Sequence, residues 1–586
     1  MCFIFLTPRV KNLHIDALLK TNPTTWGPSV SNELGRLAQG IRNVKGNDVI
    51  EFIQKSEVPK NKKVAYANMV CDFRPMKLDK WRTRLTIGGD ILDYEGDSAS
   101  PAATLLETKL ILNSTISESH QGARFMTIDL KDHFLQTIMK DAEYMRIHNK
   151  YFFEDMRKKY HINNIVDKDG FVYCRIKRGM YGLKQAARLA HDQLVNHLHK
   201  YGYSPDKYAP NIWGHETRKT KFCLFVDDFG VKYFSKNDAN HLITALQHSY
   251  DITTDWEGKH YCGLALEWDY EKGHVDISMP EYVVQALQRL QHMFPRRPQY
   301  SPHRWEVPNY SSKVQYAKKP DMSELLEKDA KTRIQRVVGT FLYYGRAIDN
   351  TTLTALNDIA QHQASPTVNT TESINMFLDY MATNPNAKIR FRRSDMILHA
   401  DTDAAYLVAS GARSRIAGYF YMGNKYHPST IKNPENNGPV HIECHLLRHV
   451  VSSAAEAETA GLFFNCKTVI VIRQMLIALG HAQPPTPIRT DNSTAVSFAN
   501  MTYTPKRSKS WDMRFHWIKD QVKGKVVYVY WDRGSRNRAD YQSKHFPPSY
   551  HLKIRPDYIL KGFNVSTLIQ KVRHIINKTP VYARVC

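Results

Sequence analysis

Two adjacent aspartates interrupt a stretch of the chain that otherwise has the apolar pattern of a buried β-hairpin. Asp227 and Asp228 lie in FCLFVDDFGVKYF, residues 222–234. A buried carboxylate without a partner is costly, so the two charges need compensation. Bound divalent cations would provide it, because Mg²⁺ prefers carboxylate oxygens as ligands.

A third acid ends another predicted strand. Asp129 closes the apolar run FMTIDL, where the next helix is expected to begin. Three acids on two neighbouring strands can hold two Mg²⁺ ions about 3.5 to 4 Å apart. Such a pair of ions activates an attacking hydroxyl and stabilises a leaving pyrophosphate.

The C-terminal half carries four more acids on separate predicted elements. Two of them end strand-like runs, and two lie near helix starts. If they converge, they form a second two-metal site, suited to activating water for phosphodiester hydrolysis. Taken singly, each could be a helix cap or a surface charge. The four acids are Asp401, Glu456, Asp491 and Asp540.

The elements that must position these acids alternate between strand-like and helical stretches. This pattern predicts a multidomain α/β and α+β protein. A Pro-, Ser- and Arg-rich stretch marks an exposed connection in the middle of the chain. The expected divisions are a leader or linker (1–58), a first domain (59–293), the connection with a helical region (294–395), a second αβ domain (396–545) and a basic tail (546–586).

The charge balance points to a polyanionic partner. The 586 residues include 81 Lys and Arg against 57 Asp and Glu, a net charge of +24. Nucleic acid is the leading candidate, and a ribosome or an anionic membrane surface is the alternative. Basic runs at 390–393, 506–509 and 553–556 are candidate contacts with a phosphate backbone, although such runs are often only solvated faces.

The eight cysteines occur singly, without a CxxC pair, which is typical of a reduced, intracellular setting. Zinc binding by His441, Cys444, His445 and His449 is an alternative to an ordinary helix start, but no second pair lies at finger spacing. The apolar N-terminal run is too short for a signal peptide, and no uninterrupted apolar run reaches about 18 residues. We therefore expect a soluble or particle-bound protein without a membrane partner.

Several longer motifs, in order, resemble the reverse transcriptase of copia-type LTR retrotransposons. They are EYMRIHNKYF (143–152), RGMYGLKQAARLAHDQL (178–194), FVDDFGVKY, YCGLALEWDYEKGHVDISMPEYVVQAL and VVGTFLYYGRAID (337–349). The resemblance runs from about residue 60 to 545. It implies a right-hand polymerase with fingers, palm and thumb, followed by a ribonuclease H-like domain. The implied partners are an RNA template, a DNA primer, their RNA/DNA hybrid and dNTPs, with two Mg²⁺, or Mn²⁺, in each active site.

The resemblance also implies roles for single residues of the polymerase. Asp129 and Asp227 would bind the metals, with Asp228 shaping the site. Phe134 would be a steric gate against a ribonucleotide 2′-OH, with a plain core phenylalanine as the alternative. The remaining positions are Arg82 and Arg84 on the triphosphate, Gln185 near the incoming nucleotide, and Gly263 and Leu264 in the hairpin that positions the primer.

In the second domain, the motifs EAE, TDN and RSKSWDMRFHWIK resemble those of the ribonuclease H that follows this polymerase. The resemblance assigns its metal ligands to the four acids named above. Glu458 competes with Glu456, because it lies two residues on and faces a different side of the helix. Asp403 is interpreted as structural. The loop before Asp540, VVYVYWDRGSRNRAD, lacks the histidine that many ribonucleases H use in product release.

Two substitutions depart from the family pattern without removing an acid: Ala187 replaces a usual proline, and Phe225 a usual tyrosine. A retropepsin-like triplet and an integrase HHCC module are lacking, so we expect a C-terminal part of a polyprotein, a processed product or a truncated gene model. The expected location is cytoplasmic, in a virus-like particle, and nuclear at some stage. The rival hypotheses are an inactive relic that binds nucleic acid, which the seven retained acids disfavour, and another LTR lineage.

Overall fold

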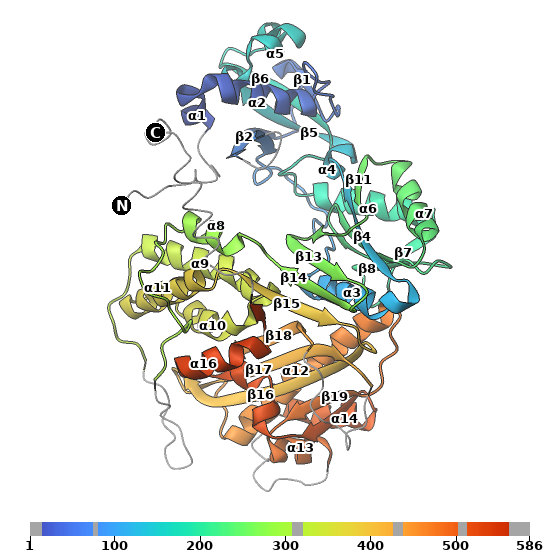
Figure 1. The fold of residues 1–586 in the computed structure, drawn as a ribbon. Helices are drawn as coiled ribbons and strands as arrows, with labels where there is room; N and C mark the ends of the chain where they lie inside the picture. Colours follow the sequence, from blue (N-terminus) through green and yellow to red (C-terminus); the bar gives the residue numbers. More distant parts are fainter. Residues whose placement is uncertain (1–14, 74–79, 307–319, 426–436, 502–512, 562–586) are drawn as a thin grey trace.

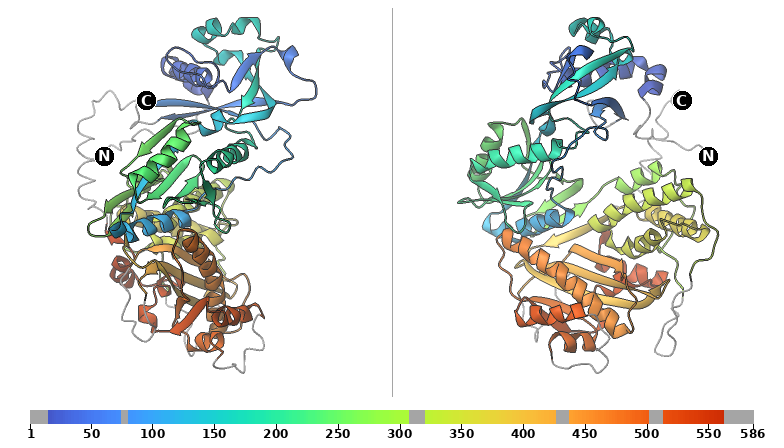
Figure 2. Two further views of the ribbon diagram at one scale, coloured as in Figure 1. Left: turned by 90° about the vertical axis from the view of Figure 1, so that its right-hand side faces the viewer. Right: turned by 180° about the vertical axis from the view of Figure 1, so that it is seen from behind.

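The computed structural model describes residues 15–73, 80–306, 320–425, 437–501 and 513–561. Figure 1 shows the N-terminal sheet at one end of an elongated molecule and the C-terminal sheet at the other, and Figure 2 gives two further views. The described elements form four β-sheets flanked by helices, in a mixed α/β architecture. We keep for its parts the names fingers, palm and ribonuclease H-like domain that the sequence resemblance predicts.

The fingers contain a five-stranded sheet in the order β1-β6-β5-β2-β3. Trp26, Val30 and Leu34 of α2 pack in one core with Leu85 of β3, and β1 pairs with β6. Residues 15–53 are therefore packed into the fingers, which corrects the prediction of a separate leader over 1–58, of which 1–14 lie outside the described residues. The elements are α1 (Ile15–Thr21), α2 (Pro23–Leu37), β1 (Ile50–Ile53), β2 (Val64–Phe73), β3 (Trp81–Ile87), β5 (Ile138–His148), α5 (Glu154–Lys159) and β6 (Phe171–Arg178).

The palm is a six-stranded sheet in the order β11-β4-β10-β9-β8-β7. Alternate residues of β4 face opposite sides, as a strand requires. Met126 and Ile128 pack with helices α6 and α7, whereas Phe125 packs in the core that contains α3. The elements are α3 (Leu105–Ser117), β4 (Arg124–Leu130), α4 (His133–Gln136), α6 (Ala186–His199), β7 (Tyr203–Pro205), β8 (Ile212–His215), β9 (Lys221–Phe225), β10 (Asp228–Tyr233), α7 (Lys236–Gln247) and β11 (Ile252–Asp255).

A third sheet has the order β12-β13-β14-β15-β21. It connects the strands β12 to β14, which follow the palm, with β21 at the end of the described chain. Because β21 pairs with β15 and Arg555 forms an ion pair with Asp349, residues 546–561 are folded into the molecule. This corrects the predicted tail over 546–586, of which 562–586 lie outside the described residues. The elements are β12 (His260–Tyr261), β13 (Leu264–Asp269), β14 (His274–Ser278), α8 (Tyr282–Arg289), α9 (Lys328–Ala347), α10 (Leu353–Gln361), α11 (Val368–Thr383), β15 (Ala387–Arg392), α16 (Pro548–Ile554) and β21 (Leu560–Lys561).

The ribonuclease H-like sheet has the order β18-β17-β16-β19-β20, with β16, β19 and β20 parallel to one another. Helix α12 packs on β16 and β17. It is long and apolar enough to cross a membrane, but half of its most apolar window is buried inside the protein, as in a core helix. The elements are β16 (Ile397–Ala409), β17 (Arg413–Gly423), β18 (Pro439–Leu446), α12 (Ala454–Ala478), β19 (Thr486–Thr490), α13 (Ser493–Ala499), α14 (Trp517–Lys523), β20 (Val527–Trp531) and α15 (Asp540–Ser543).

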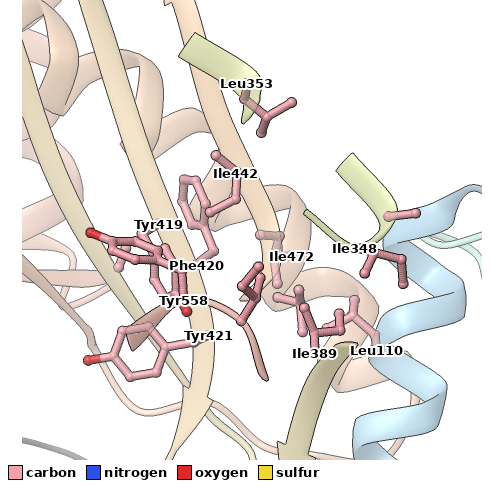
Figure 3. Close-up of a cluster of buried hydrophobic side chains, with 14 of the residues drawn as sticks. Leu110, Ile348, Leu353, Ile389, Tyr419, Phe420, Tyr421, Ile442, Ile472 and Tyr558 are labelled. Atoms are coloured by element: carbon pink, nitrogen blue, oxygen red, sulfur yellow. The ribbon is translucent and has the colours of Figure 1, made fainter. Parts of the chain in front are cut away.

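One hydrophobic core connects the palm to the ribonuclease H-like sheet. Leu110 of α3, Ile389 of β15 and Ile472 of α12 all belong to it, and Figure 3 shows these side chains from three parts of the chain close together. Lys109, beside Leu110 on α3, donates to the carbonyl oxygens of Arg346 (2.8 Å) and Pro439 (3.4 Å). The ribonuclease H-like domain is therefore packed directly against the palm.

Candidate active sites

The first acid cluster lies where β4 ends and β10 begins. In the antiparallel register, Asp228 lies opposite Asp129. Asp227 sits in the β9-β10 turn, and its carbonyl oxygen accepts a hydrogen bond from the Leu130 N–H at 3.0 Å. The turn contains Val226 at φ 63°, a conformation that is rare for a β-branched residue. The turn and the first residue of β10 thus hold Asp227 and Asp228 beside Asp129.

The three palm carboxylates act on one another electrostatically. Burial, followed by the charges of Asp227 and Asp129, raises the pKa of Asp228 to about 6. Burial and Asp129 raise the pKa of Asp227, while the positive charge of Arg84 opposes the rise. Asp129 is exposed and accepts a hydrogen bond from Thr253 Oγ1 at 3.2 Å. A bound cation would relieve this repulsion, so the carboxylates fit a divalent metal.

Two of the predicted nucleotide-binding residues adjoin this cluster. The Arg84 guanidinium on β3 lies over the Tyr181 ring, 4.5 Å from its centroid. Phe134 meets the same ring edge-on at a centroid distance of 5.7 Å. Since Arg84 also acts on Asp227, these side chains line one region beside the aspartates. Arg82 lies two residues earlier on the same face of β3, and its role stays a prediction.

Two of the other residues predicted to contact the nucleotide or the primer have buried side chains. Gln185 is 6% exposed, and its Nε2 donates to Glu143 Oε1 at 3.4 Å. Gly263 has φ 77°, and a Cβ there would meet no atom within 4 Å. The left-handed backbone at this position favours glycine, and its role beside the primer stays a prediction. Leu264 is fully buried in the core, so its side chain supports the hairpin from within.

The second acid cluster is set by the parallel pairing of β16 with β19. This register places Asp401 beside Arg489. Two residues further along the chain from each of these, Asp403 of β16 and Asp491, directly after β19, come together. Glu458 of α12 completes a group whose ligand oxygens all lie within 4.8 Å of one another. Among the described residues this is the only group of three possible metal ligands drawn together so closely.

The second cluster has strongly perturbed carboxylates. Asp403 Oδ2 and Glu458 Oε2 are buried and have no hydrogen-bond partner. Burial and then the charge of Asp540 raise the pKa of Asp403 to about 7. Burial, Asp403 and Asp491 raise the pKa of Glu458 well above its usual value. Unpartnered oxygens of this kind are suited to a hard divalent cation, and Asp540 lies within electrostatic reach as a fourth acid.

Two of the four predicted acids have other partners, which corrects the predicted set. Asp401 is 1% exposed, lies 3.1 Å from Arg489 Nε and accepts a hydrogen bond from the Arg538 N–H. Glu456 Oε2 accepts from the Ser452 N–H (2.7 Å) and hydroxyl (2.6 Å), while Ser453 caps the start of α12. Asp403 and Glu458, interpreted from sequence as structural and as a competitor, occupy the cluster with Asp491.

One of these corrections had a sequence signal. Ser453 and Glu456 have the S-x-x-E spacing that is typical of a helix N-terminus, which favours a capping role for Glu456. The choice between Asp401 and Asp403 had no such signal, because residues two apart on a strand point to the same face.

The histidines considered as zinc ligands, and arginines in two of the basic runs, have acidic partners within the protein. His441 and His445 both contact Glu443 on β18, so this carboxylate engages the imidazoles within the sheet. In the run 390–393, Arg390 binds Asp276 through two hydrogen bonds. In the run 553–556, Arg555 is paired with Asp349. The run 506–509 lies outside the described residues.

No protein-family model matches the chain. Similar proteins include the retrovirus-related Pol polyprotein from transposon TNT 1-94 of Nicotiana tabacum, 22% identical over 89% of this chain and 37% of that protein. The Pol polyprotein from transposon RE1 of Arabidopsis thaliana is 23% identical over 77% of this chain and 29% of its own length. The truncated transposon Ty1-A Gag-Pol polyprotein of Saccharomyces cerevisiae is 21% identical over 64% of this chain.

This chain thus spans about a third of the length of the curated relatives it matches. Among solved structures, the foamy viral protease-reverse transcriptase in complex with RNA/DNA hybrid overlaps 90% of the chain at 13% identity, with a TM-score of only 0.45. Together with the ordered motifs and the two acid clusters, the sequence relatives identify the chain as a distant homologue of copia/Ty1-type retrotransposon Pol polyproteins, covering their reverse transcriptase and ribonuclease H region.

Proposed function

We propose that the chain is an RNA-directed DNA polymerase that also cleaves the RNA of RNA/DNA hybrids. The observation that carries this proposal is the presence of two separate acid clusters, at the ends of strands in two different sheets. The polymerase cluster adjoins a cationic and aromatic wall, whereas the second cluster has buried, unpartnered oxygens. A cationic and aromatic wall suits a site that binds a nucleoside triphosphate, and unpartnered carboxylate oxygens suit the binding of divalent cations.

In the polymerase site, Asp129 and Asp227 would hold Mg²⁺, and Asp228 would hold the hairpin in place. Arg84 would bind the triphosphate, because a guanidinium can donate two hydrogen bonds to phosphate oxygens. Phe134 would pack against the sugar and oppose a ribose 2′-OH. The bound ions would supply Lewis-acid activation of the attacking oxygen and compensate charge on the leaving group, in this site and in the second one.

In the ribonuclease H-like site, Asp403, Glu458, Asp491 and Asp540 would hold the ions. α12 and the β16-β19 pair fix the first three carboxylates, so their positions are set before substrate binds. The net charge of +24 favours sequence-independent binding to the phosphate backbone of a hybrid. We also propose an intracellular location, as for a processed part of a retroelement polyprotein.

The test is Mg²⁺-dependent extension of a DNA primer on an RNA template, run beside cleavage of a labelled RNA/DNA hybrid. Asp227→Asn should abolish extension and leave cleavage intact, because it alters only the palm cluster. Asp491→Asn should do the reverse. If either folded variant loses both activities, the two sites are not independent. If the folded wild-type protein binds hybrid but performs neither reaction, it is an inactive relic.

A further inference from the structure

Lys544 approaches the second acid cluster from its rim. It is the residue directly after the short helix α15, and its ammonium donates a hydrogen bond to Asp540 Oδ1 at 2.5 Å. The same ammonium lies 5.6 Å from the centroid of the Phe546 ring. Burial raises the pKa of Asp403 and Asp491, and the charge of Lys544 opposes that rise in both. The charge of Lys544 also opposes the raised pKa of Glu458, so it reaches all four acids of the cluster.

The nearby arginines contact Asp401 and Asp532, not the acids of the cluster. Arg489 contacts Asp401 at 3.1 Å and Asp532 at 3.5 Å, and Arg536 contacts Asp532 at 3.6 Å. The Arg538 guanidinium lies over the Tyr421 ring, 4.9 Å from its centroid, and its charge acts on Asp401. One layer thus pairs Asp401 with buried guanidinium groups. The neighbouring layer of Asp403, Glu458 and Asp491 lies nearer to the lysine.

Arg489 and Lys544 differ in how easily each can separate from its carboxylate partner. The Arg489 side chain is 2% exposed, and Asp401 holds it in the interior. The Lys544 side chain is 41% exposed, and its ammonium ends a flexible four-carbon stem. A partly exposed lysine-carboxylate pair is weak, about 1 kcal/mol or less. Lys544 can therefore exchange with another cation at Asp540, whereas Arg489 cannot do so at Asp401.

We propose that Lys544 is a resident counter-cation of the ribonuclease H-like site, which stabilises the acid cluster without metal and competes with a divalent cation for Asp540. This inference rests on the proposed function only in assuming that the cluster binds metal. It predicts two opposite effects of removing the lysine. The metal-free protein should become less stable, because like charges lose their compensation, and the divalent cation should bind more tightly, because its competitor is gone.

The experiment uses the full chain carrying Asp129→Asn and Asp227→Asn, which disable the polymerase cluster. In that background, Lys544→Met is compared with the unchanged lysine and with Lys177→Met. Lys177 is a matched control, because it is 35% exposed and pairs with Asp48 at 2.8 Å in the fingers. Mg²⁺ alone is titrated calorimetrically, and thermal unfolding is followed in EDTA and in excess Mg²⁺.

Lys544→Met should bind Mg²⁺ about fivefold more tightly, the change expected when an ion pair worth about 1 kcal/mol no longer competes. It should also melt earlier in EDTA and gain more from Mg²⁺, whereas Lys177→Met should leave Mg²⁺ affinity unchanged. Lys544→Arg, which keeps the charge, should restore the stability in EDTA. Unchanged Mg²⁺ affinity in Lys544→Met, or in Lys544→Gln if the first variant does not fold, overturns the inference alone. Absence of any Mg²⁺ binding with Lys544 intact instead overturns the proposed metal site.

Discussion

Asp401 and Asp403 lie two residues apart on the same face of β16, yet the structure predicts opposite consequences for replacing them with asparagine. Asp401 is one partner of a buried ion pair with Arg489. Asp403 has a buried oxygen without a partner beside two other acids. Asp401→Asn should therefore destabilise the fold, and Asp403→Asn should stabilise the metal-free protein while abolishing hybrid cleavage.

The magnitudes follow from burial and charge. Removing one partner of a buried ion pair costs about 3 to 5 kcal/mol, and the lower value applies because Arg489 keeps Asp532 at 3.5 Å. Asp403 has its pKa raised to about 7, mainly by burial, whereas an unfolded aspartate titrates near 4. At pH 8 its ionised form therefore lowers the free energy of unfolding, by about 1 to 4 kcal/mol, and asparagine removes this penalty.

The sign of the pH dependence is a further check. A carboxyl whose folded pKa is raised destabilises the fold fully above that pKa, and the penalty fades as pH falls toward the unfolded value. The stabilisation by Asp403→Asn should therefore be largest at pH 8 and shrink toward pH 5. Urea unfolding in EDTA at both pH values measures it, and cleavage of a labelled hybrid in Mg²⁺ measures activity at a temperature where both variants are folded.

Two results would refute this reasoning. One is loss of cleavage in a stable Asp401→Asn protein that binds hybrid normally, together with normal cleavage by Asp403→Asn. The other is equal destabilisation by both variants in EDTA, which would mean that Asp403 has a stabilising partner in the metal-free protein. Wild-type protein and Asp532→Asn, which alters the more distant partner of Arg489 and the partner of Arg536, serve as controls.

Two further predictions concern the contacts that join the domains. Arg555→Met should lower the free energy of unfolding by about 3 to 5 kcal/mol, because it leaves Asp349 fully buried without its ion-pair partner. Urea unfolding measures this loss, and adding Asp349→Asn should recover most of it. A loss below about 1 kcal/mol would mean that residues 546–561 are not docked. Burial lowers the pKa of Lys109 to about 7, so the unfolded chain binds more protons between pH 7 and 9 and the unfolding free energy should rise with pH there, by at most about 1.4 kcal/mol per unit from this group. Lys109→Met should remove this contribution to the slope of unfolding free energy against pH. An unchanged slope would contradict the lowered pKa of the buried Lys109 amine.

The palm site was largely predictable from the sequence because its determinants are local. In the hairpin formed by this apolar run, Asp227 lies in the turn and Asp228 is the first residue of β10, opposite Asp129 near the end of β4. The divisions of the chain were less predictable at the two ends. Residues 15–53 and 546–561 are short amphipathic or basic pieces whose apolar positions find partners only in distant strands.

In the second site, the sequence by itself determined that acids would gather at strand and helix ends, and it identified Asp491 and Asp540 among them. Only the tertiary structure decided between Asp401 and Asp403 and between Glu456 and Glu458. Side-chain type and local spacing are properties of a segment, whereas the alignment of β16 with β19 depends on packing between segments more than 80 residues apart in the chain. In this alignment Arg489 pairs with Asp401, and Asp403 lies beside Asp491 with an oxygen that has no hydrogen-bond partner. The register of the two strands therefore decides which acid is available to a metal.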